Sequence, residues 1–190
     1  MTRKVEARHG DNVRQGSPGT GTYQETIPRW AASADNAIGA TGVALATGIV
    51  LQNGDTATNI SFTVGGTAAG TPTAGFAALY SPAGVLMAQS ADFGSTARAA
   101  NTEYTVALAT AQAITSTGLY YISISFTAGT VPTLRGVTVA NAVLSGAGSI
   151  TSPATRRILA QTHGAAVGAV APATIASGTA VATIPYLVVT

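Results

Sequence analysis

The chain has 190 residues, of which 46% are hydrophobic and only 8% are charged, whereas an ordinary soluble domain has roughly 25% charged residues. Five basic and three acidic residues precede Trp30, so this segment carries the whole net charge of +2 and the remainder is neutral, which argues against nucleic-acid binding. The sequence has no apolar run of 18 residues, no signal-peptide pattern and no cysteine, so we expect neither membrane insertion nor export, and there is no thiol chemistry.

Residues 1–30 are predicted to form an extended N-terminal arm. The segment holds half of the charged residues and the glycine-rich stretch 16–21, and it shows no apolar periodicity. Such a composition buries too little apolar surface to offset the entropy lost on ordering. We therefore expect the arm to lie against a partner or a neighbouring copy; the alternative is an arm that folds back on its own domain. Its expected contact residues are Arg3, Lys4, Arg8, Arg14, Arg29 and Trp30.

Trp30 is the only tryptophan and stands where the arm meets the domain. It has two interpretations. The first is a lid over one end of the domain, and the second is an interface anchor, because Trp and Arg are enriched among interface hot spots.

From residue 42 onward the pattern is that of short strands separated by turns. Segments 43–51 and 56–64 flank Gln52-Asn53-Gly54-Asp55, in which Asn-Gly is a strong hairpin signal. Segments 76–80 and 85–88 flank a tight turn at 81–84. The later predicted strands are 103–109, 119–127, 134–139, 174–175, 180–184 and 186–189. Two further segments are less regular. Segment 156–163 fits a strand or one helical turn, and 32–46 is the one segment whose pattern allows a short helix.

The segment 118–127 carries the clearest strand pattern. Tyr120, Ile122, Ile124 and Phe126 fall on one face at period two, and hydroxyl-bearing residues fall on the other. We expect the first face to enter the core and the second to form an assembly or ligand surface. Tyr121 is the candidate exposed contact on that second face.

The short strands, spaced about 8 to 13 residues apart, predict an all-β fold. We expect an antiparallel β-sandwich or jelly-roll-like domain over residues 31–190, with an extended N-terminal arm. Its Ala-, Gly- and Thr-rich part, 139–190, has the weakest strand pattern. Charged side chains usually guard the strand edges of free-standing β-proteins, but the only lysine is Lys4 in the arm. The edges must therefore be covered by closure of the sheet or by packing into a larger assembly.

The sequence shows no recognisable catalytic or metal-binding pattern. His9 and His163 each stand alone and are expected at the surface. The acidic residues after the arm are scattered, and a glycosidase pair would require Asp92 or Glu103 to meet a second carboxylate. We therefore expect no enzymatic activity, no metal and no cofactor.

Three parts of the chain carry a recognisable pattern, and they are 47–62 with TGIVL and GDTATNISF, 78–92 with ALYSPAGVL and SAD, and 117–122 with TGLYYI. With these motifs the chain resembles the β-sandwich virion structural proteins of tailed phages infecting actinobacteria, particularly minor tail and capsid-surface or decoration proteins. The similarity covers residues 30–139, more than half of the chain. Leu-Tyr-x-x-x-Gly-x-Leu and Gly-x-Tyr-Tyr patterns also occur in bacterial carbohydrate-binding sandwiches.

The resemblance implies a non-enzymatic, generally multimeric virion protein, assembled in the host cytoplasm and located in the virion. Its expected partners are other virion proteins and copies of itself, and no catalytic residues come with the resemblance. The alternative is a glycan-binding module that recognises the host envelope through exposed Tyr and Asn side chains of a sheet face. We expect no nucleic acid and no membrane among the partners.

Overall fold

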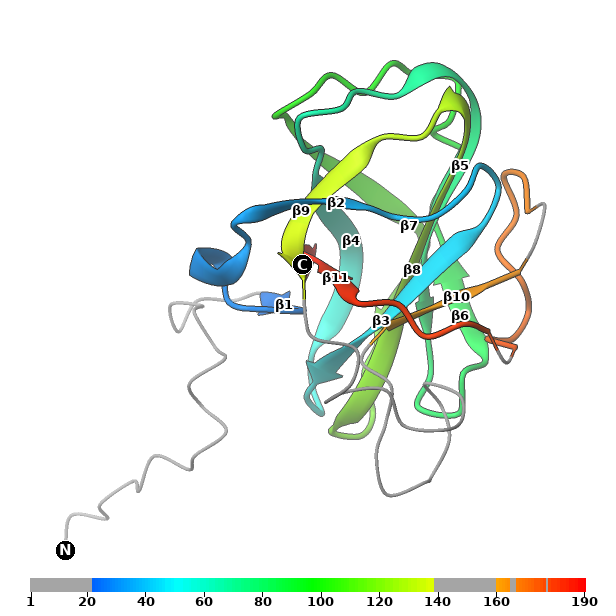
Figure 1. Cartoon of the computed structure of the whole chain (residues 1–190). Coiled ribbons are helices and arrows are strands. Elements are labelled where there is room, and N and C mark those ends of the chain that lie inside the picture. Colours follow the sequence, from blue (N-terminus) through cyan, green and yellow to red (C-terminus); the bar gives the residue numbers. More distant parts are fainter. Residues whose placement is uncertain (1–21, 139–159, 165–166, 177) are drawn as a thin grey trace, which may run out of the picture.

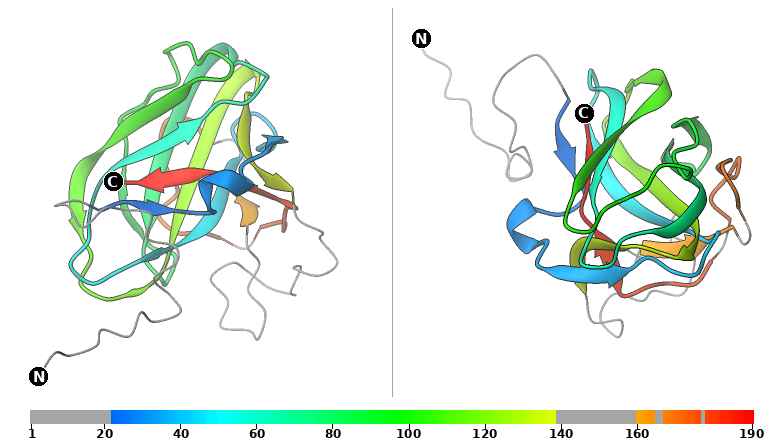
Figure 2. Two further views of the ribbon diagram at one scale, coloured as in Figure 1. Left: turned by 90° about the vertical axis from the view of Figure 1, so that its left-hand side faces the viewer. Right: turned by 90° about the horizontal axis from the view of Figure 1, so that it is seen from above.

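The computed structural model describes residues 22–138, 160–164, 167–176 and 178–190. Within these ranges the chain is an antiparallel, all-β, sandwich-like fold, which confirms the predicted fold class (Figures 1 and 2). Four of the predicted arm contacts, Arg3, Lys4, Arg8 and Arg14, lie outside the described residues, as does His9.

The strands form three sheets. The four-stranded sheet has the order β1-β12-β4-β7, with strands Gln24–Glu25, Leu187–Val189, Thr56–Thr63 and Glu103–Ala113. The five-stranded sheet has the order β10-β3-β8-β5-β6, with strands Ala160–His163, Ala44–Leu51, Gly118–Thr130, Gly70–Tyr80 and Leu86–Gln89. The three-stranded sheet has the order β11-β9-β2, with strands Thr183–Pro185, Thr133–Thr138 and Ala34–Ala37. A single 3₁₀ turn, η2, covers Arg29–Ala31 and follows β1.

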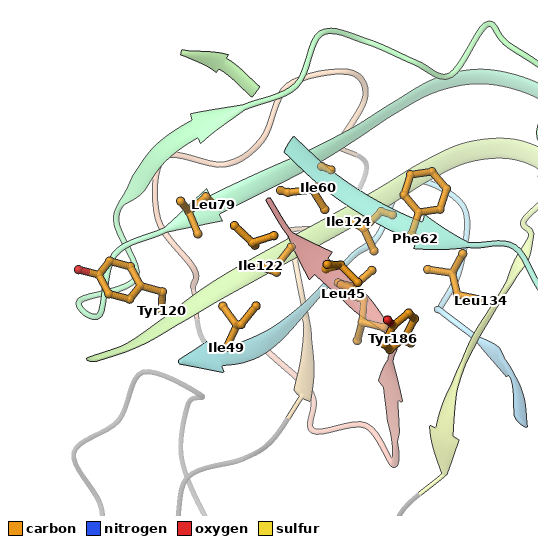
Figure 3. Close-up of a cluster of buried hydrophobic side chains, with 14 of the residues drawn as sticks. Leu45, Ile49, Ile60, Phe62, Leu79, Tyr120, Ile122, Ile124, Leu134 and Tyr186 are labelled. Atoms are coloured by element: carbon orange, nitrogen blue, oxygen red, sulfur yellow. The ribbon is translucent and has the colours of Figure 1, made fainter. Parts of the chain in front are cut away.

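The main core lies between the inward faces of the four-stranded and five-stranded sheets. The predicted inner face of β8 is buried there, and Phe62 of β4 meets Phe126 edge to face with ring centres 5.7 Å apart. Each large apolar side chain buried in this way contributes about 1.5–3 kcal/mol. Figure 3 shows ten labelled residues of the core: Leu45, Ile49, Ile60, Phe62, Leu79, Tyr120, Ile122, Ile124, Leu134 and Tyr186.

The second face of β8 is also buried, so the prediction that it is an assembly or ligand surface is wrong. Tyr121 and Ser123 have no exposed surface, because residues 167–176 of the same chain cover this side of the five-stranded sheet. Tyr80 Oη donates a hydrogen bond to Pro172 O at 2.9 Å and ties the covering segment down. Tyr121 is therefore not an exposed contact residue.

The Asn-Gly turn forms, but it does not join a hairpin. Asp55 N donates to Gln52 O at 3.0 Å, and Gly54 takes a φ of 93°, which favours glycine. The strand before the turn, β3, pairs with β8 and β10, whereas β4 pairs with β7 and β12. The turn is therefore a corner between two sheets. The turn at 81–84 does join a hairpin, because β5 pairs with β6.

The short helix expected within 32–46 is absent from that segment. Residues 34–37 form β2, which pairs with β9, and β3 begins at Ala44. The sheet pairing overrides the weak helix preference of this alanine-rich stretch. The segment 156–163, for which a strand and a helical turn were both predicted, contains strand β10 at Ala160–His163, and residues 156–159 lie outside the described residues.

Candidate functional site

The root of the arm is fixed to the four-stranded sheet by a polar cluster of Tyr23, Glu25, Arg29 and Tyr186, which we call the junction cluster. Tyr23 and Glu25 are two positions apart in the extended chain around β1, so their side chains share a face. Glu25 is only 5% exposed, and its Oε1 accepts hydrogen bonds from Tyr186 Oη at 2.7 Å and Tyr23 Oη at 2.9 Å. A buried carboxylate with two such donors holds β1 against the end of the chain.

Arg29 lies on the solvent side of the junction cluster. Its Nε donates to Tyr186 Oη at 3.2 Å, and its guanidinium lies 6.0 Å from the centre of the Tyr186 ring. The hydrogen bond to Tyr186 raises the pKa of Arg29 above its usual value, so the guanidinium stays charged. Burial raises the pKa of Tyr186, which keeps this phenol protonated and able to donate to Glu25.

Trp30 follows Arg29 in η2 and is 79% exposed. This exposure excludes the interpretation of Trp30 as a lid over one end of the domain. Its role as an interface anchor stays a prediction. Of the predicted contacts, Arg29 thus belongs to the junction cluster, and Trp30 follows it in η2.

The outer face of the four-stranded sheet continues from the junction cluster and is rich in hydroxyl groups. We use the name outer face for the outward side chains of β4 and β7, which are Asn59, Ser61, Thr63, Glu103, Thr105 and Ala107. Ser61 and Thr105 are paired across the strands, and their hydroxyl oxygens are 2.7 Å apart. Glu103 supplies the single charge of the outer face, and its negative charge contributes to the raised pKa of Arg29.

A polar pocket of about 500 Å³ opens at the far end of the outer face. Its lining is Thr22, Gly54, Asp55, Thr56, Thr58, Asn59 and Thr190. The lining is internally braced, since Thr56 N donates to Thr22 Oγ1 at 2.7 Å and Thr58 Oγ1 donates to Thr190 O at 2.8 Å. Such a lining suits a polyhydroxylated ligand better than an apolar one.

Sequence reasoning missed Tyr23, Glu25 and Tyr186. The alternating side chains around Glu25 are the one sequence signal that a short strand precedes Pro28, but this pattern covers few residues. Tyr186 lies 161 positions from Glu25, so no local spacing connects the two side chains.

His163 is buried, which contradicts its expected surface position. Its Nε2 is 2.7 Å from Ser123 Oγ, and the ring meets Tyr80 edge-on with centres 5.8 Å apart. Burial lowers the pKa of His163 to about 4, so the imidazole is neutral at pH 7. The Ser-His distance resembles that of a nucleophile and its base, but within the described ranges Nδ1 has no hydrogen-bond partner to orient the ring. The pair therefore joins β8 to β10 and is not organised as a catalytic triad.

The acidic residues considered for a glycosidase pair have separate local contacts. Asp92 Oδ1 accepts hydrogen bonds from Gly75 N at 2.9 Å and Gly94 N at 2.8 Å, which shapes a loop. Asp35 pairs with Arg135 at 2.9 Å, and Glu103 lies on the outer face.

Comparisons with known proteins give no family for this chain, since no family model and no curated protein matches it. Within the described ranges, no three His, Asp or Glu side chains gather in a group that would hold a metal ion. Nor is any helix of the described residues long and apolar enough to span a membrane. The junction cluster, the outer face and the pocket are thus the features on which a function can be based.

Proposed function

We propose that this protein is a non-enzymatic structural component of a tailed-phage virion, a capsid decoration or minor tail protein that attaches through residues 1–30. The observation that carries the proposal is the contrast at the arm root. Glu25 is buried and doubly hydrogen-bonded, whereas Trp30, five positions later, is 79% exposed. A fixed backbone that presents a solvated Trp beside an Arg is well suited to anchoring a partner.

The charge distribution supports attachment to an assembly. The domain has few charges, and several of them are used internally. Asp35 is paired with Arg135, and Arg98 is buried with its guanidinium 5.2 Å from the ring centre of Phe93 and 4.6 Å from that of Tyr104. A surface with so little net charge offers weak repulsion between copies packed side by side.

The first prediction concerns Trp30. Trp30→Ala should leave the unfolding midpoint unchanged, because the indole is mostly exposed, and should lower the amount of protein in purified particles about ten-fold or more. Occupancy is measured by quantitative mass spectrometry of particles made with each variant. Val170→Ala is the matched control, since Val170 is 71% exposed but belongs to the segment that covers the opposite sheet.

A chain without residues 1–21 should likewise fold and fail to enter particles. Normal incorporation of that shortened chain would disprove attachment through the arm. A loss of incorporation caused equally by Val170→Ala would show that Trp30 has no special role.

The second candidate function is a glycan-binding module for the host envelope, and the pocket beside Asn59 and Thr190 favours it. Hydroxyl and amide groups of this kind form the hydrogen bonds that sugars require. Titration of the full chain with soluble host cell-wall oligosaccharides tests this function. Saturable binding that Thr56→Val weakens would support it, and the absence of binding at millimolar sugar would remove it.

A further inference from the structure

The edges of the five-stranded sheet are covered by the C-terminal part of the same chain. Beside β6, Leu86 N donates to Ala173 O at 2.9 Å. Beside β10, Thr162 N donates to Thr179 O at 2.9 Å. These contacts protect both edges without the charged side chains that strand edges usually carry.

Strand β7 has no such cover from the part of the chain that the structure describes. It is the last strand of the four-stranded sheet, and its pairing with β4 is interrupted after Ala107. Leu108 forms an isolated bridge with Ser90, so the edge that stays open among the described residues is 103–107. Within it, Glu103, Thr105 and Ala107 are exposed, and neither Lys nor Pro blocks the approach of another chain.

The hydrogen bonds of β4 show which backbone groups of β7 point outward. Asn59 and Thr190 exchange two backbone bonds, of 2.8 and 3.1 Å, so Asn59 turns its backbone toward β12. Antiparallel ladders alternate, and Ile60 and Phe62 therefore bond to Val106 and Tyr104. Val64 N, which donates to Thr102 O at 2.9 Å, continues the same pattern.

The β7 residues between these pairs have their backbone groups on the opposite side of the strand. Glu103, Thr105 and Ala107 direct their N–H and C=O groups away from β4 and toward the open edge. The edge thus offers a ladder of backbone donors and acceptors over five residues, about 16 Å of strand. A ladder of this kind binds an extended peptide by strand addition.

We propose that the open edge of β7 binds residues 2–9 of the arm of a neighbouring copy as an added strand. This inference rests on the proposed attachment through the arm and names its partner. Residues 2–9 contain neither Gly nor Pro, and they carry three basic residues and one acidic residue, which complements Glu103.

The position of the arm fits this partner. The arm leaves the domain at β1, which is the opposite edge of the same sheet. Residues 10–21 can span about 40 Å when extended, on the order of the width of a domain of this size. An arm that leaves one edge and binds the other edge of the next copy makes a head-to-tail contact, which builds rings or lattices.

Cross-linking between two differently labelled full-length chains tests the proposal, because the natural chain has no cysteine. One chain carries Ala7→Cys and the other carries Ala107→Cys, joined by a flexible bismaleimide. Linkage should exceed that to a chain with Asn53→Cys, which places the thiol in the exposed corner turn.

A second change in the acceptor chain tests the backbone ladder. Thr105→Pro removes the outward N–H and should lower the linkage to Ala107→Cys about ten-fold. Thr105→Val is the matched control, because it loses the same hydroxyl contact with Ser61 but keeps the N–H. An excess of a peptide of residues 1–12 should also lower the linkage, which tests the site even where the proline variant fails to fold.

Three results would overturn the proposal. The first is that the Ala7→Cys chain links equally well to Asn53→Cys and to Ala107→Cys chains. The second is linkage that neither Thr105→Pro nor the peptide reduces. The third is linkage of Ala107→Cys chains to one another in place of the arm, which would indicate pairing between two β7 strands. If cross-linking fails but incorporation into particles still depends on the arm, the proposed function stands and the arm binds a different virion protein. Successful cross-linking without arm-dependent incorporation would refute the proposed function alone.

Discussion

At the scale of single residues, His163 is the clearest case of a side chain whose burial has a measurable result. Its polar partner among the described residues is Ser123, and its pKa is lowered from 6.5 to about 4 because burial disfavours the charged form. The folded protein therefore holds the imidazole neutral at pH values where the unfolded chain takes up a proton.

This difference predicts how stability depends on pH. The contribution of His163 is fully present above pH 6.5 and is lost as the pH falls toward 4, by roughly 3 kcal/mol at most. Urea unfolding at pH 7 and at pH 4 measures it. His163→Gln is the control, since it cannot titrate and should show a smaller loss from the carboxylates alone; equal losses in both proteins would contradict the prediction.

The junction cluster makes a second prediction at this scale. Tyr186→Phe removes the 2.7 Å hydrogen bond to the buried Glu25 and the acceptor of Arg29 Nε. The free energy of unfolding should fall by about 1–3 kcal/mol, because a buried carboxylate loses a donor. Tyr23→Phe removes a more exposed phenol and should cost less in the same equilibrium unfolding measurement. The reverse order would show that Tyr186 does not hold Glu25.

At the scale of elements, the open edge of β7 predicts an alternating pattern of amide exchange. In dilute protein, the amides of Thr105 and Ala107 should exchange with solvent about a hundred times faster than those of Tyr104 and Val106, which bond to β4. Hydrogen exchange followed by NMR measures each amide. Uniform protection along β7 in dilute protein would mean that another part of the same chain covers this edge.

Local signals in the sequence predicted where strands and turns lie better than they predicted which strands pair with each other. The Asn53-Gly54 turn was predicted correctly because glycine at a φ of 93° is a local requirement. Its two flanking strands belong to different sheets, and nothing within the turn distinguishes a corner from a hairpin. For the same reason the alternation of β8 predicted its inner face, but not the burial of Tyr121 by a segment more than 40 residues later.

At the scale of the whole molecule, a domain with so few charges needs some other protection for its strand edges. In the five-stranded sheet, residues 173–176 and 178–181 cover the edges. Those residues are small and weakly patterned, so their sequence did not reveal this role. The candidate site was predicted only in part for the same reason. Trp30 and Arg29 can be identified from the local sequence, whereas Glu25 and Tyr186 meet only in the folded chain.

The order of the four-stranded sheet bears on how the protein is made. β12 is the last strand in the sequence, yet it lies between β1 and β4 (Figure 2). Gln24 pairs with Val189 and Glu25 with Val188, and contacts between such distant residues slow folding.

Until residues 187–189 have left the ribosome, β1 has no partner strand and Glu25 has no Tyr186 to hold it. β1 can take its place in the sheet only after β12 has been made. A chain that ends before Tyr186 therefore lacks both the strand that pairs with β1 and this tyrosine, which donates to Glu25.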